Sequence, residues 1–391
     1  MKKNVAFIIP SLKNGGAERV LSTISMNLDE NIKQYIFTWN GKDPDYDFNG
    51  KIVEIDVQNS TSLIKNVGVL LKRVREVRKY KKEYKIDTCI SHLEGPNIVN
   101  LLSKGSEKTV ITVHNFQSKE RTGLYGFIFK ILMKLLYNRA DQIVVVSKAI
   151  KQDLVNNFNI KRTKIEVIYN PFDCKKIERL AEEELDDKYK EIFNNDVIIN
   201  VGRLTEQKGQ WNLIKSFYHL KKKNSKVKLV ILGSGELEDR LKELVYNLGL
   251  GKDVIFLGFQ SNPFKFVSKA KIFALTSLYE GFPMCIPESM ACSTAIISVD
   301  CKSGPREILA NNSEDLKVEG AVYCDYGVLT PEFYNSINTN EANITLEEEI
   351  FSDALNQMLK MDLSNYCKNG KIRVQKFNVD KIISRWIELI N

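Results

Sequence analysis

The chain has 391 residues and a formal net charge of +8, and this length exceeds what one hydrophobic core ordinarily serves. Hydrophobic residues make up 43% and charged residues 27%, a globular balance, and no stretch approaches the roughly 18 apolar residues that would indicate a membrane-spanning helix. Residues 1–180 carry 31 Lys and Arg against 19 Asp and Glu, a balance of +12, which favours an acidic partner such as anionic lipid, nucleic acid or a phosphorylated acceptor.

The first half alternates short apolar runs with helical stretches. Lys2 and Lys3 precede an apolar run that is too short for a signal peptide, so the first element is interpreted as a strand. The pattern predicts helices at 17–28, 65–85 and 125–137, and strands at 5–9, 34–38, 52–55, 88–91, 109–113 and 142–146. This alternation indicates a parallel sheet with helices on both faces.

A second unit of the same kind starts near residue 196. It has predicted helices at 210–222, 236–248 and 282–291, and predicted strands at 197–201, 228–232, 253–256, 272–275 and 295–299. The polar residues 310–348 are expected to form loops and short helices, and a last helix is expected at 380–390. A charged joint at 175–195 separates the units, which gives domains at 1–180 and 181–375 and a C-terminal helix, 376–391, that packs back on the first domain.

Seven scattered cysteines, none in CxxC spacing, favour free thiols in a reducing cytoplasm over a zinc site or a disulfide framework. The segment Asp43-Pro44-Asp45 looks like a metal-binding DxD motif, but it lies in a polar loop and is interpreted as a solvated turn. No Walker loop, no clean dinucleotide fingerprint and no metal-ligand spacing is present, so a dehydrogenase is not supported and no metal is expected.

Cations follow the strand at 197–201. Gly202 permits the chain to turn close to a ligand, and Arg203 and Lys208 stand at the carboxyl end of the strand, where open α/β sheets bind ligands. A guanidinium fork and a point-charge ammonium together suit a diphosphate. The alternative is a solvated loop with two ordinary surface cations.

A glutamate pair, Glu280 and Glu288, brackets the entry to the helix expected at 282–291. Gly281 and Pro283 suit a tight strand-to-helix turn, and the unpaired first amides of the helix favour a phosphate. Glu288 lies within that helix, in reach of sugar hydroxyls. The alternative is a capping carboxylate and a surface glutamate.

Two further glycine turns and three histidines complete the candidates. Gly15-Gly16 opens the first helix in a phosphate-compatible turn, but without the full G-x-G-x-x-G pattern it is weak evidence for a dinucleotide site. Gly233-Ser234-Gly235, after the strand at 228–232, is a second glycine turn of equally weak specificity. His114 and His92 stand at strand ends, where functional side chains are common. His219 lies in a helix and is expected to be structural.

Together these residues resemble the retaining, two-domain (GT-B) family 4 glycosyltransferases, also called group 1, which include bacterial capsule, O-antigen and lipopolysaccharide enzymes. The resemblance spans nearly the whole chain and rests on the segments 15–19, 146–150, 167–171, 201–209, 232–235, 280–288 and 303–307. It implies two Rossmann-like parallel-sheet domains that face each other across a donor-binding cleft. One departure is Pro171 after Asn170, where the family usually has Gly.

The resemblance also implies a role for each matching position. Arg203 and Lys208 would bind the donor diphosphate, Glu288 the ribose hydroxyls and Glu280 the transferred sugar. His114 would contact the donor sugar, and Gly16, beside Gly15, would lie near the diphosphate. The segment Gly281-Phe282-Pro283-Met284 would bind sugar and phosphate. The catalytic set would be His114, Glu280, Arg203 and Lys208, with no cofactor and no metal.

The implied activity is transfer of a hexosyl or N-acetylhexosaminyl group, with retention, from a UDP- or GDP-sugar to a glycan or a polyprenyl-diphosphate-linked acceptor. No nucleic acid partner is expected from the resemblance. The alternatives are a nucleotide-sugar epimerase of the same fold and a non-catalytic nucleotide-sugar-binding membrane scaffold. Segment 65–82 of the predicted helix at 65–85 and the predicted helix at 125–137 both combine apolar positions at helical spacing with Lys and Arg, which favours peripheral attachment to the anionic inner face of the cell membrane. The alternative is that they only cover the sheet.

Overall fold

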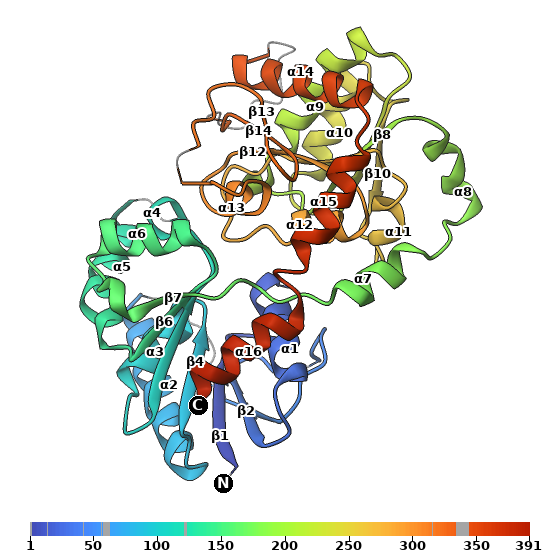
Figure 1. Ribbon diagram of the computed structural model, residues 1–391. Coiled ribbons are helices and arrows are strands. Elements are labelled where there is room, and N and C mark those ends of the chain that lie inside the picture. Colours follow the sequence, from blue (N-terminus) through green and yellow to red (C-terminus); the bar gives the residue numbers. More distant parts are fainter. Residues whose placement is uncertain are drawn as a thin grey trace. The chain divides into compact units, whose positions relative to one another are not determined.

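The structure is a computed structural model that describes residues 2–13, 15–41, 43–55, 57, 63–120, 123–314, 316–333 and 344–391 (Figure 1). It contains two compact units, Met1–Phe172 with Phe377–Asn391, and Asp173–Lys376. The division precedes the expected residue 180 because helix α7 (Cys174–Ala181) belongs to the second unit, where Ser268 Oγ donates a hydrogen bond to the Ala181 carbonyl.

The first unit is built on a seven-stranded parallel sheet in the order β3-β2-β1-β4-β5-β6-β7. The strands coincide with the predicted apolar runs to within two residues, except β7, which the sequence analysis did not assign. They are β1 (Lys3–Ile8), β2 (Ile32–Thr38), β3 (Lys51–Glu54), β4 (Thr88–His92), β5 (Lys108–Val113), β6 (Gln142–Val145) and β7 (Ile165–Val167).

Helices cover both faces of this sheet. Figure 1 shows α1 and α16 on one face and α2 and α3 on the other. Alternate side chains of β1 divide between the faces: Val5 and Phe7 join the cluster that includes α1 and α16, whereas Ala6 and Ile8 pack towards α2 and α3. Right-handed crossovers place α5 and α6 on the same face as α2 and α3. The helices are α1 (Gly16–Asn27), α2 (Leu63–Glu83), α3 (Glu94–Leu102), α4 (Gln117–Glu120), α5 (Gly123–Leu136), α6 (Lys148–Phe158) and α16 (Val379–Ile390), with 3-10 turns η1 (Tyr137–Arg139) and η2 (Arg162–Lys164).

The last helix, α16, completes the core of the first unit. The chain re-enters this unit beside the point where it leaves, because the Val379 amide donates to the Phe172 carbonyl at 3.0 Å. Trp386 is buried among residues of β1, β2 and α1. The apolar face of this helix therefore covers a sheet face for which the described part of the first 172 residues supplies one helix, α1.

The second unit has a seven-stranded sheet in the order β10-β9-β8-β11-β12-β14-β13, parallel except for the pair β13–β14. Its strands are β8 (Val197–Val201), β9 (Lys228–Leu232), β10 (Val254–Gly258), β11 (Ile272–Leu275), β12 (Ala295–Val299), β13 (Val322–Tyr323) and β14 (Val328–Thr330). The expectation of loops and short helices over residues 310–348 is wrong for β13 and β14. Three buried residues next to β12 suffice to extend the sheet, and so short a run gives no periodic signal.

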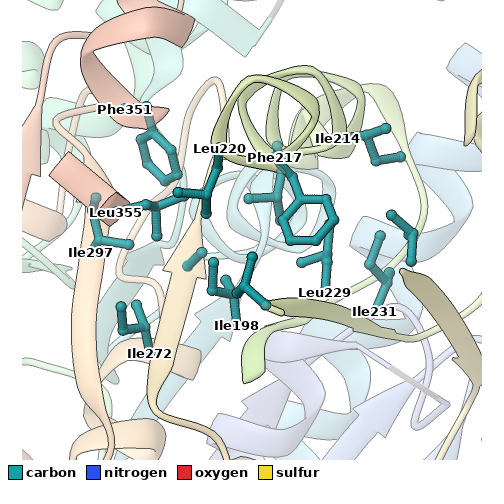
Figure 2. Packing of buried hydrophobic residues seen from close by; sticks show 14 of the residues in the cluster. Ile198, Ile214, Phe217, Leu220, Leu229, Ile231, Ile272, Ile297, Phe351 and Leu355 are labelled. Carbon is teal, nitrogen blue, oxygen red and sulfur yellow. The ribbon is translucent and has the colours of Figure 1, made fainter. Parts of the chain in front are cut away.

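Figure 2 shows the core on one face of this sheet. Ile198, Leu229 and Ile272 rise from three strands to meet Phe217 of α9 and Phe351 of α14, so two helices distant in sequence pack side by side. The helices of this unit are α7, α8 (Asp187–Lys190), α9 (Gln210–Lys223), α10 (Glu238–Asn247), α11 (Phe264–Val267), α12 (Cys285–Ala291), α13 (Pro305–Leu309), α14 (Leu346–Lys360) and α15 (Ser364–Val374), with 3-10 turns η3 (Glu191–Asn194) and η4 (Glu206–Lys208).

Candidate functional site

The strand order of the second unit reverses between β8 and β11, which are neighbours in the sheet although β9 and β10 lie between them in the chain. The chain leaves β8 towards β9 on one side, and leaves β11 towards β12 on the other. Loops at such a point diverge, so the carboxyl edge of the sheet can accommodate a ligand there. Arg203 and Lys208 follow β8, and Glu280 follows β11.

The Arg203 loop rests on the glycine turn after β9. The Gly202 amide donates to the Leu232 carbonyl and the Leu204 amide to the Ser234 carbonyl, both at 3.0 Å. A Cβ on Gly233, whose φ is +134°, would collide with the Gly202 carbonyl. The second glycine turn therefore supports the cation loop, while the Arg203 side chain remains exposed.

The Lys208 loop is tied to the segment that follows β11. The Leu278 amide donates to the Gln207 carbonyl at 2.8 Å, and Thr276 Oγ1 donates to the Lys208 carbonyl at 3.2 Å. Gly209 has φ +60°, and a Cβ there would meet the Thr276 carbonyl, so only glycine allows this approach. These contacts fix the backbone on both sides of the Lys208 side chain.

Lys208 and Glu280 form an ion pair at this edge. Lys208 Nζ donates to Glu280 Oε1 at 2.6 Å, and both side chains are largely buried. Burial disfavours the charged ammonium, but the Glu280 carboxylate more than offsets this, and the pKa of Lys208 lies above its ordinary value. The ammonium is therefore charged and held at a fixed place.

The segment Gly281-Phe282-Pro283-Met284 forms a turn before α12. The expected helix start at Phe282 is wrong, because a residue that precedes proline disfavours the helical conformation and the Gly281 carbonyl accepts a hydrogen bond from Ser303 Oγ at 2.6 Å. The helix begins at Cys285, and buried Glu288 lies in its first turn. A Cβ on Gly304 would strike Pro283, so the loop after β12 packs tightly against this turn.

In the first unit, His114 directly follows β5 and lies beside His92, the last residue of the neighbouring strand β4. His92 Nδ1 is 3.0 Å from His114 Nε2, and the rings are stacked with centroids 5.2 Å apart. Both rings are buried. Burial lowers the pKa of His92 well below its ordinary value and the pKa of His114 to about 4, so both are neutral at pH 7.

The remaining candidates lie elsewhere. Gly15 precedes α1 and Gly16 is its first residue, where a Cβ would find open space. His219 lies part-way along α9, away from the carboxyl edge. Asp43 and Asp45 are exposed in a bend. All seven cysteines are free. Within the described ranges, no group of three or more His, Cys, Asp or Glu side chains could hold a metal ion.

Two residues that hold the loops of the site in place were not predicted from the sequence. Gln207 Nε2 donates to the Tyr279 carbonyl at 3.0 Å, and Ser303 adopts a strained φ of +76° while it anchors Gly281. Glutamine and serine are common in loops, so the residue type alone does not indicate that Gln207 or Ser303 supports the site. The only local signal was that Ser303-Gly304 follows a strand at the same edge.

The chain matches two family models, that of the glycosyltransferase family 4 over residues 14–176 and that of the glycosyl transferases group 1 over residues 181–323. An uncharacterized glycosyltransferase of Methanocaldococcus jannaschii is 36% identical over 82% of this chain and 83% of its own length. The N-acetylgalactosamine-N,N'-diacetylbacillosaminyl-diphospho-undecaprenol 4-alpha-N-acetylgalactosaminyltransferase of Campylobacter jejuni is 33% identical over 81% and 86%. Among solved structures, HepE from Anabaena in complex with UDP superposes with a TM-score of 0.75 at 20% identity and 99% coverage of both chains, a likeness of fold.

The buried histidine pair makes stability depend on pH. The unfolded imidazoles titrate near 6.5 and the folded ones lower, so below pH 6.5 only the unfolded state gains protons, and the free energy of unfolding falls as the pH drops towards about 4. We expect a slope of up to about 1.4 kcal/mol per pH unit for each histidine, and a shallower slope for His92→Asn. Urea unfolding between about pH 7 and 5 measures both slopes. Equal slopes would contradict the prediction.

Proposed function

Because this chain belongs to the group 1 glycosyltransferases with the GT-B fold, we propose that it transfers a hexosyl or N-acetylhexosaminyl group from a nucleotide-sugar donor to a glycan or lipid-linked acceptor, with retention of anomeric configuration. The observation that carries the donor assignment is the Lys208–Glu280 pair at the β8/β11 switch point. This pair places an ammonium that can bind phosphate next to a carboxylate that can bind sugar hydroxyls, and both lie on one rigid edge of the sheet.

The donor site is assigned to the second unit. Arg203 and Lys208 bind the diphosphate, the turn that starts at Gly281 contacts sugar and phosphate, and Glu288 binds the ribose hydroxyls. Because Lys208 has three N–H donors, its ammonium can contact a phosphate oxygen while it remains bonded to Glu280. Burial strengthens both contacts relative to water.

The proposed chemistry needs no metal. When the bond between the anomeric carbon and the phosphate oxygen breaks, negative charge grows on the leaving diphosphate, and Arg203 and Lys208 stabilise it. The acceptor hydroxyl attacks the anomeric carbon from the face that the diphosphate leaves. Its proton passes to the leaving phosphate oxygen, so the products are the glycoside and the nucleoside diphosphate. In the first unit, His114 contacts the sugar and Gly16, next to Gly15, approaches the diphosphate.

We assign the acceptor to a saccharide on a polyprenyl diphosphate, because the Campylobacter jejuni relative is named for a diphospho-undecaprenol substrate. An enzyme that extends such a substrate works at a lipid surface. The relevant structural fact is that no helix in the described part of the chain is long and apolar enough to cross a bilayer. We propose that attachment comes from a surface of the protein.

Helix α5 offers such a surface. Phe127, Ile131 and Leu135 recur every four residues and so share one face of the helix. Their exposed fractions are 62%, 42% and 67%, while Phe129 and Met133 are buried on the opposite side. Lys134 is exposed next to this stripe. A helix that only covered the sheet would not keep large apolar side chains in water along its outer face.

Helix α2 lies over the same sheet face and adds charge. Val67 and Leu71 are each 59% exposed, and Lys72 and Arg75 are exposed beside them. Not every cation of this helix is free for lipid: Arg73 donates to the Val57 carbonyl, and Lys81 is buried against Glu107. We propose that α5 and α2 attach the enzyme to the anionic inner face of the cell membrane; the seven free thiols fit that reducing compartment.

The function is tested by thermal unfolding with a panel of UDP- and GDP-sugars, since a bound donor stabilises the protein by mass action. The stabilising donor is then incubated with a polyprenyl-diphosphate-linked saccharide, and NMR of the product gives its anomeric configuration. We expect a glycoside with the donor's configuration, formed equally well with EDTA. An inverted product would contradict retention, and loss of turnover that magnesium or manganese restores would contradict metal independence.

Substitutions at Lys208 and Glu280 should change the affinity for UDP in opposite directions. Lys208→Ala should weaken UDP binding and lower transfer at least about tenfold, or about 1.4 kcal/mol. Glu280→Gln should also lower transfer, yet tighten UDP binding roughly threefold or more, because it removes a negative charge beside the diphosphate. Calorimetry with UDP and initial rates separate the effects. Lys226→Ala, an exposed residue before β9 at the opposite edge, is the control. Weaker UDP binding in Glu280→Gln would refute this arrangement.

Membrane attachment is tested by flotation with vesicles that contain or lack anionic phospholipid. We expect binding to anionic vesicles at low salt, its loss in the double variant Phe127→Ser/Leu135→Ser, and partial loss in Lys72→Gln/Arg75→Gln. All four side chains are exposed, so folding should not suffer. Ile372→Ser, which removes a 61% exposed apolar side chain in the second unit, is the matched control. If the wild type stays unbound, or the α5 variant floats like the wild type, the attachment surface is wrong.

A further inference from the structure

The nitrogens of His92 and His114 that face each other share a single proton. Both rings are neutral, and each neutral imidazole carries one N–H. The 3.0 Å contact between His92 Nδ1 and His114 Nε2 therefore has two possible forms. Either His92 donates to His114, which then carries its proton on Nδ1, or His114 donates to His92, which then carries its proton on Nε2.

The surroundings of His92 separate the two forms. The His92 ring packs near an aromatic cage, Phe7 and Trp386, whose ring centroids are 6.3 and 6.2 Å away. Within the described residues, His92 Nε2 is buried and has no hydrogen-bond partner. If His114 were the donor, this nitrogen would carry a buried N–H without an acceptor. A buried N–H without an acceptor is rarer than an unsatisfied acceptor.

Trp386 reinforces this choice. Its Nε1 is also buried without a partner in the described part of the chain, and an indole N–H can only donate. A protonated His92 Nε2 would put a second unsatisfied donor in this cage. An unprotonated His92 Nε2 is a hydrogen-bond acceptor instead, which complements the donor of Trp386.

We propose that His92 is a positioning residue that holds His114 in the Nδ1–H tautomer, so that His114 acts on its ligand as a neutral hydrogen-bond donor and not as a base. Because the bond to His92 occupies Nε2, Nδ1 is the nitrogen left for a ligand. The ligand, a sugar oxygen of the donor, rests on the function proposed above. A protonated Nδ1 cannot take the proton of the acceptor hydroxyl, which leaves that proton to the departing phosphate.

The C-terminal helix takes part in this arrangement. Trp386 of α16 is one wall of the cage that keeps His92 in an apolar environment. Protonation of His114 at Nε2 would require the loss of the hydrogen bond from His92, which adds to the effect of burial in keeping His114 neutral. Helix α16 thereby influences the protonation state of His114, a residue of a different element.

The tautomer is measured directly by ¹⁵N NMR of the imidazoles in the full-length protein. The chain has three histidines, so His219→Gln leaves a spectrum with only the pair. At pH 7 we expect His114 to show a protonated Nδ1 and a bare Nε2. In His92→Leu the fixed tautomer should be lost, whereas in His92→Asn the side-chain amide can donate in place of Nδ1 and should keep it.

Activity provides the second readout. We expect kcat/KM to fall about tenfold in His92→Leu and to stay within about twofold of the wild type in His92→Asn and His219→Gln, while the Kd for UDP stays unchanged in all three. If His92→Leu does not fold, the wild-type and His92→Asn spectra decide the matter. A His114 protonated on Nε2 in the wild type, or a His92→Asn variant as impaired as His92→Leu, would overturn the proposal. If the wild type forms no glycoside with any donor but keeps the Nδ1–H tautomer, the proposed function fails instead.

Discussion

The hydrogen bond between Lys208 and Glu280 depends on the order of the strands. The two residues follow β8 and β11, which lie far apart in the chain but side by side in the sheet. Around them, backbone contacts such as that from Leu278 to Gln207 fix both loops, and Gly209 permits their close approach. The result is a charged ammonium in a fixed position, and the role proposed for it, stabilisation of a leaving diphosphate, requires such preorganisation.

The carboxyl edge of the sheet in the first unit carries a different kind of polar pair. There the ends of β4 and β5 carry two neutral imidazoles instead of an ion pair, because the surrounding cage is apolar. Burial removes their positive charge and leaves only the direction of one hydrogen bond to be decided. The two sheet edges therefore differ in chemistry: the second unit carries a fixed charge, and the first carries uncharged hydrogen-bonding groups.

The outer face of the first unit follows from how helices cover a parallel sheet. Each helix must bury one stripe, and on α5 Phe129 and Met133 fulfil this requirement. Nothing in the packing of the sheet demands that Phe127 and Leu135, on the other side, be apolar. Similarly, α2 buries Val77 and pairs Lys81 internally, yet keeps Lys72 and Arg75 exposed. The proposed attachment to a lipid surface rests on this second apolar stripe and the cations that border it.

The sequence by itself determined the local elements and the motif positions, because periodicity and glycine or proline punctuation act over a few neighbouring residues. Runs such as Val197–Val201 matched their strands, and Arg203, Lys208 and Glu280 fell on strand-following loops as predicted. Only the tertiary structure decided where each helix or strand begins and ends. Helix α12 starts at Cys285 because the Ser303 hydroxyl donates a hydrogen bond to the Gly281 carbonyl. The tertiary structure also decided which residues meet. Gly233 supports the Arg203 loop, and Trp386 closes the cage of His92 from the far end of the chain. Such contacts join residues whose separation in sequence carries no periodic signal, so packing alone brings them together.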